Sequence, residues 1–412
     1  MTSKIYLTGG WGYGNKGDNV ILMAMLNSLK ENIPSYELFI TSFSPDELKR
    51  MHSLSSQKSI HRLLTTRFLK NPLFLVRIFS VWFWRVTKKY FNNPIMICPS
   101  LRKHLDLIKN SDVVLMAGGG YFNDAWKDAL PSRLLEIEIA SYFNKKIMLY
   151  GQSIGPFSKE SCEGVLRDYL SGVSRVTFRD IKSEQTLRLA QFDELKMKLT
   201  ADEVNLLPPR NYTQPKAENF SVGVMVQHFR KHEGPTGSSS AGWIDTSEKY
   251  YEQIAIALEE LNKLKKVHFI IIPSTTWDQS SCNKVARKLN EKKISNFTLL
   301  NNPNVNDFVS ACQTVDLMIS TNMHPIIIAS TMCKPSIAIS YHYKLDDFMD
   351  SIGMSEFTSK IDDFTAEWLV NNFEKITSNY GLYAERVKDN HLRVQELAKG
   401  NISILKDLIN SN

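Results

Sequence analysis

The stretch Val113-Val114-Leu115-Met116-Ala117-Gly118-Gly119-Gly120 joins an apolar run to a turn of three glycines. The run is typical of a buried strand, and the glycines allow the backbone to approach a ligand closely. Similar turns follow apolar runs at Gly14-Asn15-Lys16-Gly17-Asp18, Gly151-Gln152-Ser153-Ile154-Gly155-Pro156 and Asn322-Met323-His324. Because open α/β sheets bind ligands beyond the carboxyl ends of their strands, we expect these turns to form one site fed by both halves of the chain.

Strand and helix patterns alternate throughout, which favours α/β architecture with parallel sheets and crossover helices. In the first half we predict strands at Ile5–Thr8, Glu37–Thr41, Ile95–Cys98, Val113–Ala117, Ile147–Tyr150, Arg175–Phe178 and Lys198–Ala201. In the second half we predict Ser221–Val226, His268–Ile272, Thr298–Leu300, Leu317–Ile319 and Ser336–Ile339. Helices should begin near Asp18, Trp126 and Ile181.

A chain of 412 residues suggests two domains. The prolines at 208, 209 and 215 mark the best boundary. We therefore predict an N-terminal Rossmann-like domain over 1–207, a linker over 208–219, a second Rossmann-like domain over 220–360, and C-terminal helices over 361–412. The two domains should face a cleft, which suits an enzyme that joins a small donor to a large acceptor.

Five scattered cysteines form no C-x-x-C pair, so we expect reduced thiols in a cytoplasmic protein. The sequence contains no H-E-x-x-H motif, and we expect neither a metal nor an organic cofactor. We find no signal peptide, because glycines interrupt the first apolar run at once.

The net charge of +7 is local: twelve Lys and Arg and no Asp or Glu lie between Leu48 and Leu105, which leaves about −5 (7 − 12) elsewhere. Within this segment, 72–86 is a short, arginine-containing apolar run, too short to span a bilayer as a helix of roughly 20 residues. Its helix would carry a basic edge with Arg77, Ser80, Arg85 and Lys88 beside a broad apolar face. We expect residues near 58–91 to contact an anionic membrane surface. A buried helix with extended arginines is the alternative, and nucleic acid is disfavoured because the patch is aliphatic and Trp-rich.

Candidate site residues of the first half follow its predicted strands. Gly14, Asn15 and Asp18 lie at a strand-to-helix turn that can bind an anion or a substrate, although Asp18 can simply cap the helix. Asp124 follows Gly119 and Gly120 and can accept a proton from a sugar hydroxyl, or cap the next helix. Arg179 can bind a carboxylate or phosphate, or form an intramolecular ion pair.

The second half supplies cations and a histidine. His324 follows a strand and opens a helix, so it can transfer a proton or bind an anion, although a lone histidine is usually structural. Lys344 is a phosphate or carboxylate contact or a solvated charge. His228, Arg230 and His232 alternate after a strand and can converge on an anion, or they belong to an exposed polar loop.

Taken together, the motifs resemble the polysaccharide pyruvyl transferase family over roughly residues 4–353. The matching features are Gly14-Asn15-Lys16-Gly17-Asp18 with Ile21-Leu22, Gly118-Gly119-Gly120 with Asp124, Gly151-Gln152-Ser153-Ile154-Gly155-Pro156, Arg179-Asp180 with Ser183, Asp202, His324 with Ala329 and Pro335, and Tyr341 with Lys344 and Phe348. The resemblance implies a GT-B-like fold with the acceptor on the first domain and the donor on the second.

It also implies transfer of a pyruvate ketal from phosphoenolpyruvate onto two hydroxyls of a sugar, with release of phosphate. The sugar would belong to a capsule, an exopolysaccharide or a cell-wall precursor, and a lipid-linked precursor would place the enzyme at the inner face of the cytoplasmic membrane. His324 would then be the acid or a donor ligand, and Asp124 the base or a group that orients the hydroxyl. The substrate-binding residues would be Gly14, Asn15, Asp18, Gly119, Gly120, Gln152, Arg179, His228, Arg230, Asn322 and Lys344. The family commonly has Arg-x-His where this chain has Asn322-Met323-His324. Either another cation, such as Arg179, Arg230 or Lys344, compensates, or the donor differs.

Two other functions fit the same fold. One is a nucleotide-sugar glycosyltransferase of the GT-B type that acts on a lipid-linked glycan. The other is a non-catalytic sugar-binding or scaffold protein of a membrane assembly.

Overall fold

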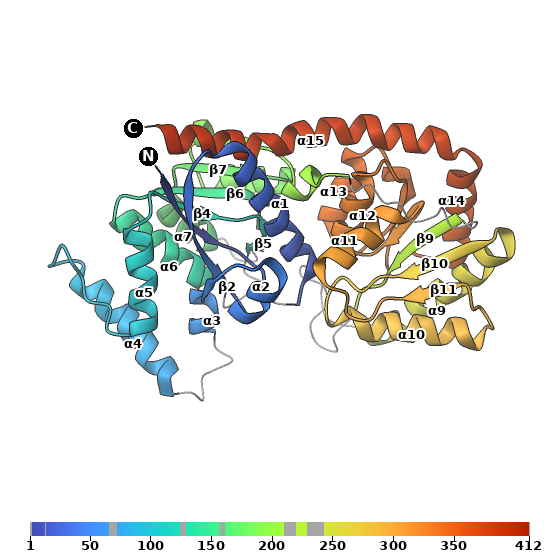
Figure 1. The fold of residues 1–412 in the computed structure, drawn as a ribbon, viewed down its shortest axis with the longest axis horizontal. Coiled ribbons are helices and arrows are strands. Elements are labelled where there is room, and N and C mark those ends of the chain that lie inside the picture. The colour runs from blue at the N-terminus through green and yellow to red at the C-terminus, as the bar shows by residue number, and fades with distance from the viewer. Residues whose placement is uncertain are drawn as a thin grey trace. The chain divides into compact units, whose positions relative to one another are not determined.

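The computed structural model describes residues 2–12, 14–65, 72–123, 129–155, 157, 161–209, 220–228 and 243–411 (Figure 1). The chain forms two compact α/β units. Unit 1 comprises Met1–Tyr13, Ile21–Glu203 and Ala398–Asn412, and unit 2 comprises Gly14–Val20 and Val204–Leu397. The Gly14–Asp18 turn therefore belongs to unit 2, although it lies early in the sequence.

Unit 1 is built on a parallel sheet in the order β3-β2-β1-β4-β6-β7-β8, with β5 paired to β6. Its strands are β1 (Ser3–Thr8), β2 (Tyr36–Ser42), β3 (Ser56–Lys58), β4 (Val113–Met116), β5 (Gly119–Phe122), β6 (Lys146–Ile154), β7 (Arg175–Phe178) and β8 (Met197–Leu199). The helices are α1 (Lys16–Asn32, whose first residues belong to unit 2), α2 (Pro45–His52), α3 (Ile60–Leu64), α4 (Pro72–Thr87), α5 (Pro99–Lys109), α6 (Ala129–Tyr142), α7 (Ser161–Leu170) and α8 (Ile181–Leu189).

Unit 2 has a parallel sheet in the order β11-β10-β9-β12-β13-β14. Its strands are β9 (Phe220–Met225), β10 (Val267–Ile271), β11 (Phe297–Leu299), β12 (Leu317–Ser320), β13 (Ser336–Ser340) and β14 (Thr358–Lys360). The helices are α9 (Trp243–Leu264), α10 (Asp278–Glu291), α11 (Val305–Thr314), α12 (Met323–Ser330), α13 (Tyr343–Ser351), α14 (Ala366–Ser378) and α15 (Tyr380–Asn410), whose last turns from Ala398 belong to unit 1. This is the strand order of a doubly wound nucleotide-binding fold.

The central strands are largely apolar and buried, because helices cover both faces of a parallel sheet. All four residues of β4 and all five of β13 are buried. In unit 1, Trp84, Phe122 and Phe178 belong to one apolar core. The predicted α/β class with two mostly parallel sheets is confirmed by this topology.

The predicted strand at Ile95–Cys98 is wrong. These residues form an extended segment that leads into α5, and side chains of α4 satisfy their backbone donors. The Cys98 N–H donates to Ser80 Oγ at 2.8 Å, and the Ile95 N–H donates to Thr87 Oγ1 at 3.1 Å. The apolar residues of this segment predicted a strand, but in the described part of the chain the segment belongs to neither sheet.

Candidate active site

The centre of the second sheet is a topological switch point. Strands β9 and β12 are neighbours there, and the chain order runs away from them in opposite directions. Doubly wound folds bind ligands beyond the carboxyl ends of such strands. In unit 2 this edge carries His228 after β9, and Asn322 and His324 after β12.

The Gly14–Asp18 turn joins this edge through backbone pairing. Asn15 forms an antiparallel bridge with Thr275, which follows β10. The Lys16 N–H donates to the Ser274 carbonyl at 2.9 Å, and the Thr276 N–H donates to the Gly14 carbonyl at 3.0 Å. An N-terminal motif and the loop after β10 thus form one substructure of unit 2.

Side chains of the turn hold its shape. Asn15 Oδ1 accepts from the Gly17 N–H at 2.9 Å, and Asn15 Nδ2 donates to Asp18 Oδ2 at 3.0 Å. Helix α1 begins at Lys16, two residues before the predicted start, so Asp18 lies in the first turn of the helix. Asn15 and Asp18 therefore support the start of α1, where backbone N–H groups favour an anion.

His324 packs against this turn. A Cβ atom at position 17 would lie 2.2 Å from His324 Nδ1, so only glycine leaves room for the imidazole. His324 is the second residue of α12 and is partly exposed. The structure thus brings together the first predicted motif and the predicted catalytic histidine.

Two buried charges accompany the histidine. Lys16 is 5% exposed, and its Nζ donates to Asn302 Oδ1 at 3.4 Å. Asp278, at the start of α10, is fully buried. Burial raises the pKa of Asp278 to about 6, although hydrogen bonds and the Lys16 ammonium act in the opposite direction.

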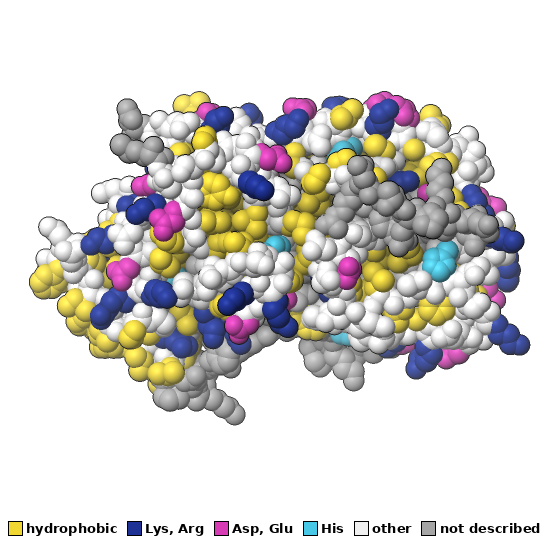
Figure 2. All heavy atoms as spheres, in the orientation of Figure 1, with side chains coloured by type: hydrophobic (Ala, Val, Ile, Leu, Met, Phe, Trp, Pro, Cys, Tyr) yellow, Lys and Arg dark blue, Asp and Glu magenta, His cyan; other side chains and the backbone are white. Residues whose placement is uncertain are grey.

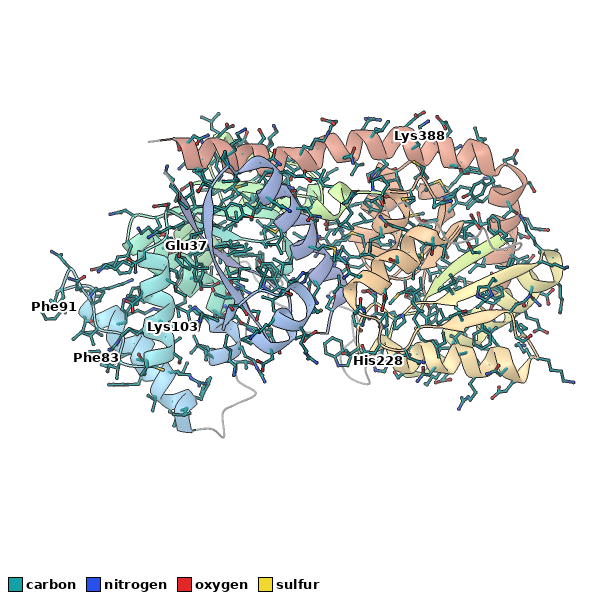
Figure 3. All side chains as sticks on the ribbon, in the orientation of Figure 1. Glu37, Phe83, Phe91, Lys103, His228 and Lys388 are labelled. Atoms are coloured by element: carbon teal, nitrogen blue, oxygen red, sulfur yellow. The ribbon has the colours of Figure 1, made fainter. Side chains whose placement is uncertain are left out.

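Asp278 organises the neighbouring loops. Its Oδ1 accepts from the His228 N–H at 2.9 Å, and its Oδ2 accepts from the Thr275 N–H at 2.8 Å. The ring Nδ1 of His228 lies 3.0 Å from Ser280 Oγ, and His228 is marked in Figure 3. Arg230 and His232, predicted to act with His228, lie outside the described residues.

Asn322 is the N-cap residue of α12 and bonds to Tyr341. The Tyr341 hydroxyl donates to Asn322 Oδ1 at 3.1 Å. Burial and the Asp278 charge raise the pKa of Tyr341, so the hydroxyl stays protonated as a donor. Lys344, in the first turn of α13, lies with its Nζ 5.9 Å from the Tyr343 ring centre.

Arg179 follows strand β7 of unit 1. Arg179 is buried, pairs with Asp202 and donates through Nε to Ser153 Oγ at 2.9 Å. This is the intramolecular ion pair that the sequence left open, so anion binding by Arg179 stays a prediction. Asp124 lies outside the described residues.

Gln152 and the glycines at 118–120 lie where strands β4, β5 and β6 pack against one another. Gln152 is fully buried, and its amide donates to the Met116 carbonyl and the Tyr121 hydroxyl, both at 2.9 Å. Gly119 and Gly120 open strand β5, and a Cβ on Gly118 would lie 2.9 Å from the Gly151 carbonyl oxygen. Close packing of strands therefore accounts for Gly118, and ligand contact by Gly119, Gly120 and Gln152 stays a prediction.

Sequence reasoning missed an internal charge network at the end of β1. Arg133 on α6 donates to the Gly9 carbonyl at 2.8 Å and pairs with Glu136 at 2.8 Å. Glu136 also accepts from the Tyr6 hydroxyl at 3.2 Å. The signal was an Arg and a Glu three residues apart inside a largely apolar helix. Lys16 was also missed, although it stands within the Gly14–Asp18 motif. Within the described ranges, no group of three His, Cys, Asp or Glu side chains is placed to hold a metal ion.

Comparison with known proteins gives a family and a fold. The family model "polysaccharide pyruvyl transferase" matches residues 15–343. The amylovoran biosynthesis protein AmsJ of Erwinia amylovora is 22% identical, and the alignment covers 92% of each chain.

The solved structures are similar in fold alone. A UDP-N-acetylglucosamine 2-epimerase described as putative, from Listeria monocytogenes, superposes with a TM-score of 0.63 at 9% identity, over 96% of this chain and 95% of that one. Alr3699/HepE of Anabaena, in complex with UDP-glucose, superposes with a TM-score of 0.56 at 13% identity, over 98% of both chains. These neighbours confirm the predicted GT-B-like class.

Proposed function

Because the chain belongs to the polysaccharide pyruvyl transferase family, we propose that it transfers a pyruvate ketal from phosphoenolpyruvate onto two hydroxyls of a sugar and releases phosphate. The sugar is part of a surface polysaccharide, such as a capsule or exopolysaccharide, or of a cell-wall precursor. The relationship to an amylovoran biosynthesis protein supports a polysaccharide acceptor. The main observation in support of a donor-binding site here is the packing of His324 against the turn that contains Lys16.

The reaction requires an acid, a base and cations. Protonation of the donor's methylene carbon makes its C2 an oxocarbenium-like centre that one sugar hydroxyl attacks. Loss of phosphate regenerates such a centre, the second hydroxyl attacks it, and the two hydroxyl protons balance the methyl group and the released phosphate. We assign the acid role to His324 and the base role to Asp124. Each step of this kind typically contributes 10²–10⁴-fold in rate.

Lys16 is our candidate for the cation that position 322 lacks. The usual arginine at position 322 would supply charge to the donor, and Asn322 is neutral. Lys16 is a buried cation of the same unit, near the Asp278 carboxylate and one residue from the glycine that contacts His324. We propose that Lys16 binds the phosphate or carboxylate of the donor, with Lys344 as a second cation. Gly14, Asn15 and Asp18 hold the α1 N-terminus toward the same anion.

We also propose that the acceptor is lipid-linked and that the enzyme works in the cytoplasm, at the inner face of the cytoplasmic membrane. The number of basic residues near α4 supports this placement. No helix in the described part of the chain is long and apolar enough to cross a bilayer.

The test is phosphate release from phosphoenolpyruvate with pooled acceptor sugars, lipid-linked ones included. We expect acceptor-dependent release that falls at least about 10²-fold in His324→Ala. Lys16→Met should raise the KM for phosphoenolpyruvate, and Lys16→Arg should restore part of it. His268→Ala, on β10 of the same unit, is the matched control and should keep full activity.

A second candidate is a nucleotide-sugar glycosyltransferase, because a protein of similar fold was crystallised with UDP-glucose. Thermal shifts with phosphoenolpyruvate and with UDP-glucose separate the two reactions. Stabilisation by UDP-glucose alone, with no phosphate release from phosphoenolpyruvate, would favour the glycosyltransferase.

A further inference from the structure

Helix α4 presents an apolar face to solvent. Leu75 is 65% exposed and Trp82 is 56% exposed, and both lie on this 16-residue helix. The other exposed apolar side chains of the helix are Leu73, Val76, Ile78 and Phe79. Figure 2 shows apolar side chains gathered along the margin of unit 1 that α4 forms. Exposed apolar patches of this kind mark sites of interaction.

The turn after α4 extends this surface. Tyr90 is 76% exposed, and Phe91, Ile95 and Ile97 are also exposed. Figure 3 labels Phe83 on α4 and Phe91 in the turn that follows it. We call the exposed apolar side chains of α4 and of residues 90–97 the α4 surface.

The polar side chains of α4, and Lys88 just after it, have partners within unit 1, although Arg85 remains exposed. Arg77 donates to the Leu63 carbonyl at 3.1 Å, and Ser80 is fully buried. Arg85 and Lys88 both bind Glu138, at 2.7 and 2.5 Å. Glu138 on α6 and the carbonyl of Leu63 thus bind Arg77, Arg85 and Lys88, and contact of this basic edge with a membrane stays a prediction.

The opposite side of α4 is packed into unit 1. Phe74, Val81 and Trp84 are buried, and Trp84 stacks edge-on against Tyr142 on α6. The helix is thus held firmly in place while its outer face lacks cover from the described residues. A fixed amphipathic helix with exposed Leu, Phe and Trp has the character of an interfacial membrane helix.

The basic residues around the α4 surface favour a membrane that contains anionic lipids. The twelve Lys and Arg between Leu48 and Leu105 are accompanied by no acidic residue in that segment, and Glu138 on α6 pairs with two of them. Lys89 and Lys103 are exposed close in sequence to the α4 surface. A membrane with anionic lipids complements this charge, and each basic residue near such a surface adds about 1 kcal/mol.

We propose that the α4 surface inserts into the interface of an anionic phospholipid bilayer. The apolar side chains enter the headgroup–acyl boundary, and Lys89 and Lys103 contact lipid phosphates. The helix lies on the bilayer and does not cross it. This inference deepens the membrane part of the proposed function, but its test requires neither donor nor acceptor, so the two can fail separately.

The experiment is flotation of the full chain with vesicles of phosphatidylcholine alone or mixed with phosphatidylglycerol. We expect binding to the mixed vesicles and weaker binding to the neutral ones. Phe79→Ser with Trp82→Ser should lower binding about tenfold or more, since both side chains are exposed and their loss should not affect folding. Leu382→Ser with Leu392→Ser, equally exposed on α15, is the matched control and should bind like the wild type.

A second measurement tests whether Trp82 enters the bilayer. Brominated lipid should quench part of the fluorescence of the wild type, and Trp82→Phe should lose that part while it keeps vesicle binding. Failure of the wild type to bind mixed vesicles, or unchanged binding by the Phe79 and Trp82 double variant, would overturn the proposal. So would a wild-type dimer, measured by light scattering, that the same double variant converts to a monomer without vesicle binding, because the α4 surface would then bind a second copy.

Discussion

Gly17 and His324 occupy adjoining space in unit 2, and a single added Cβ at position 17 would lie 2.2 Å from the imidazole Nδ1. The two residues are far apart in sequence, yet the glycine sets how close the α1 backbone comes to the histidine. This relationship links the N-terminal motif to the strand end that carries His324.

We predict that Gly17→Ala displaces His324 and lowers kcat by about tenfold or more, since loss of a positioned acid typically costs 10²–10⁴-fold. Gly17 lies in a helix, so alanine itself favours the backbone by up to about 1 kcal/mol, and thermal unfolding should change little. The control is Gly381→Ala in α15, where nothing lies within 4 Å of the added Cβ. Equal activities of the two variants would contradict the prediction.

Replacing Asn322 by the arginine common in the family should by itself lower the stability of the protein. Asn322→Arg removes the acceptor of the Tyr341 hydroxyl, and an unpaired buried polar group costs about 1–3 kcal/mol. Adding Tyr341→Phe should recover most of that stability. A double-mutant cycle on the free energy of unfolding measures the coupling, and additive losses would show that the hydrogen bond contributes little.

Arg179 should be more important for stability than for donor affinity. Its pair with Asp202 is buried on both sides, so Arg179→Met should lower the free energy of unfolding by about 3–5 kcal/mol. Arg188→Met, which breaks exposed ion pairs of α8, should cost less than about 1 kcal/mol. Denaturant unfolding measures the effect of Arg179→Met on stability, and steady-state kinetics measure its effect on the KM for phosphoenolpyruvate. A raised KM with unchanged stability would identify Arg179 as an anion clamp instead.

Glu203 should make unit 1 less stable as the pH rises. Burial raises the pKa of Glu203 to about 7, above its ordinary value of 4.5, although Ser28, Tyr150 and Asn401 donate hydrogen bonds to it. Because the folded state holds the proton more tightly, the stabilisation is complete below about pH 4.5 and is lost as the pH rises through about 7. The loss is on the order of 3 kcal/mol.

Glu203→Gln should remove this dependence on pH. Thermal melts between pH 4.5 and 8 should show a shallower decline for Glu203→Gln than for the wild type, and Glu291→Gln, an exposed change on α10, should follow the wild type. Parallel curves for all three proteins would contradict the prediction, because they would show that ionisation of Glu203 costs the folded state little free energy.

Much of the fold followed from local patterns. Strand β7 matches its prediction residue for residue, and α8 begins at Ile181 as expected, because Asp180 caps it through the Ser183 N–H. The short strands β3 and β14 were missed, because three polar residues carry no periodic signal. The extended segment 95–98 was mistaken for a strand, since only its surroundings show that Ser80 and Thr87 satisfy its backbone.

By itself, the sequence determined the α/β class, the order of the strand-end motifs and the resemblance to a family, because these depend on periodicity and on turn chemistry between near neighbours. Only the tertiary structure placed Gly14–Val20 in unit 2, Gly17 against His324, and Arg179 on Asp202. It also paired Arg77 and Arg85 of α4 with groups of unit 1 and left the apolar face outward. These outcomes depend on contacts between residues distant in the chain, whose energies of packing and charge pairing do not appear in any local pattern.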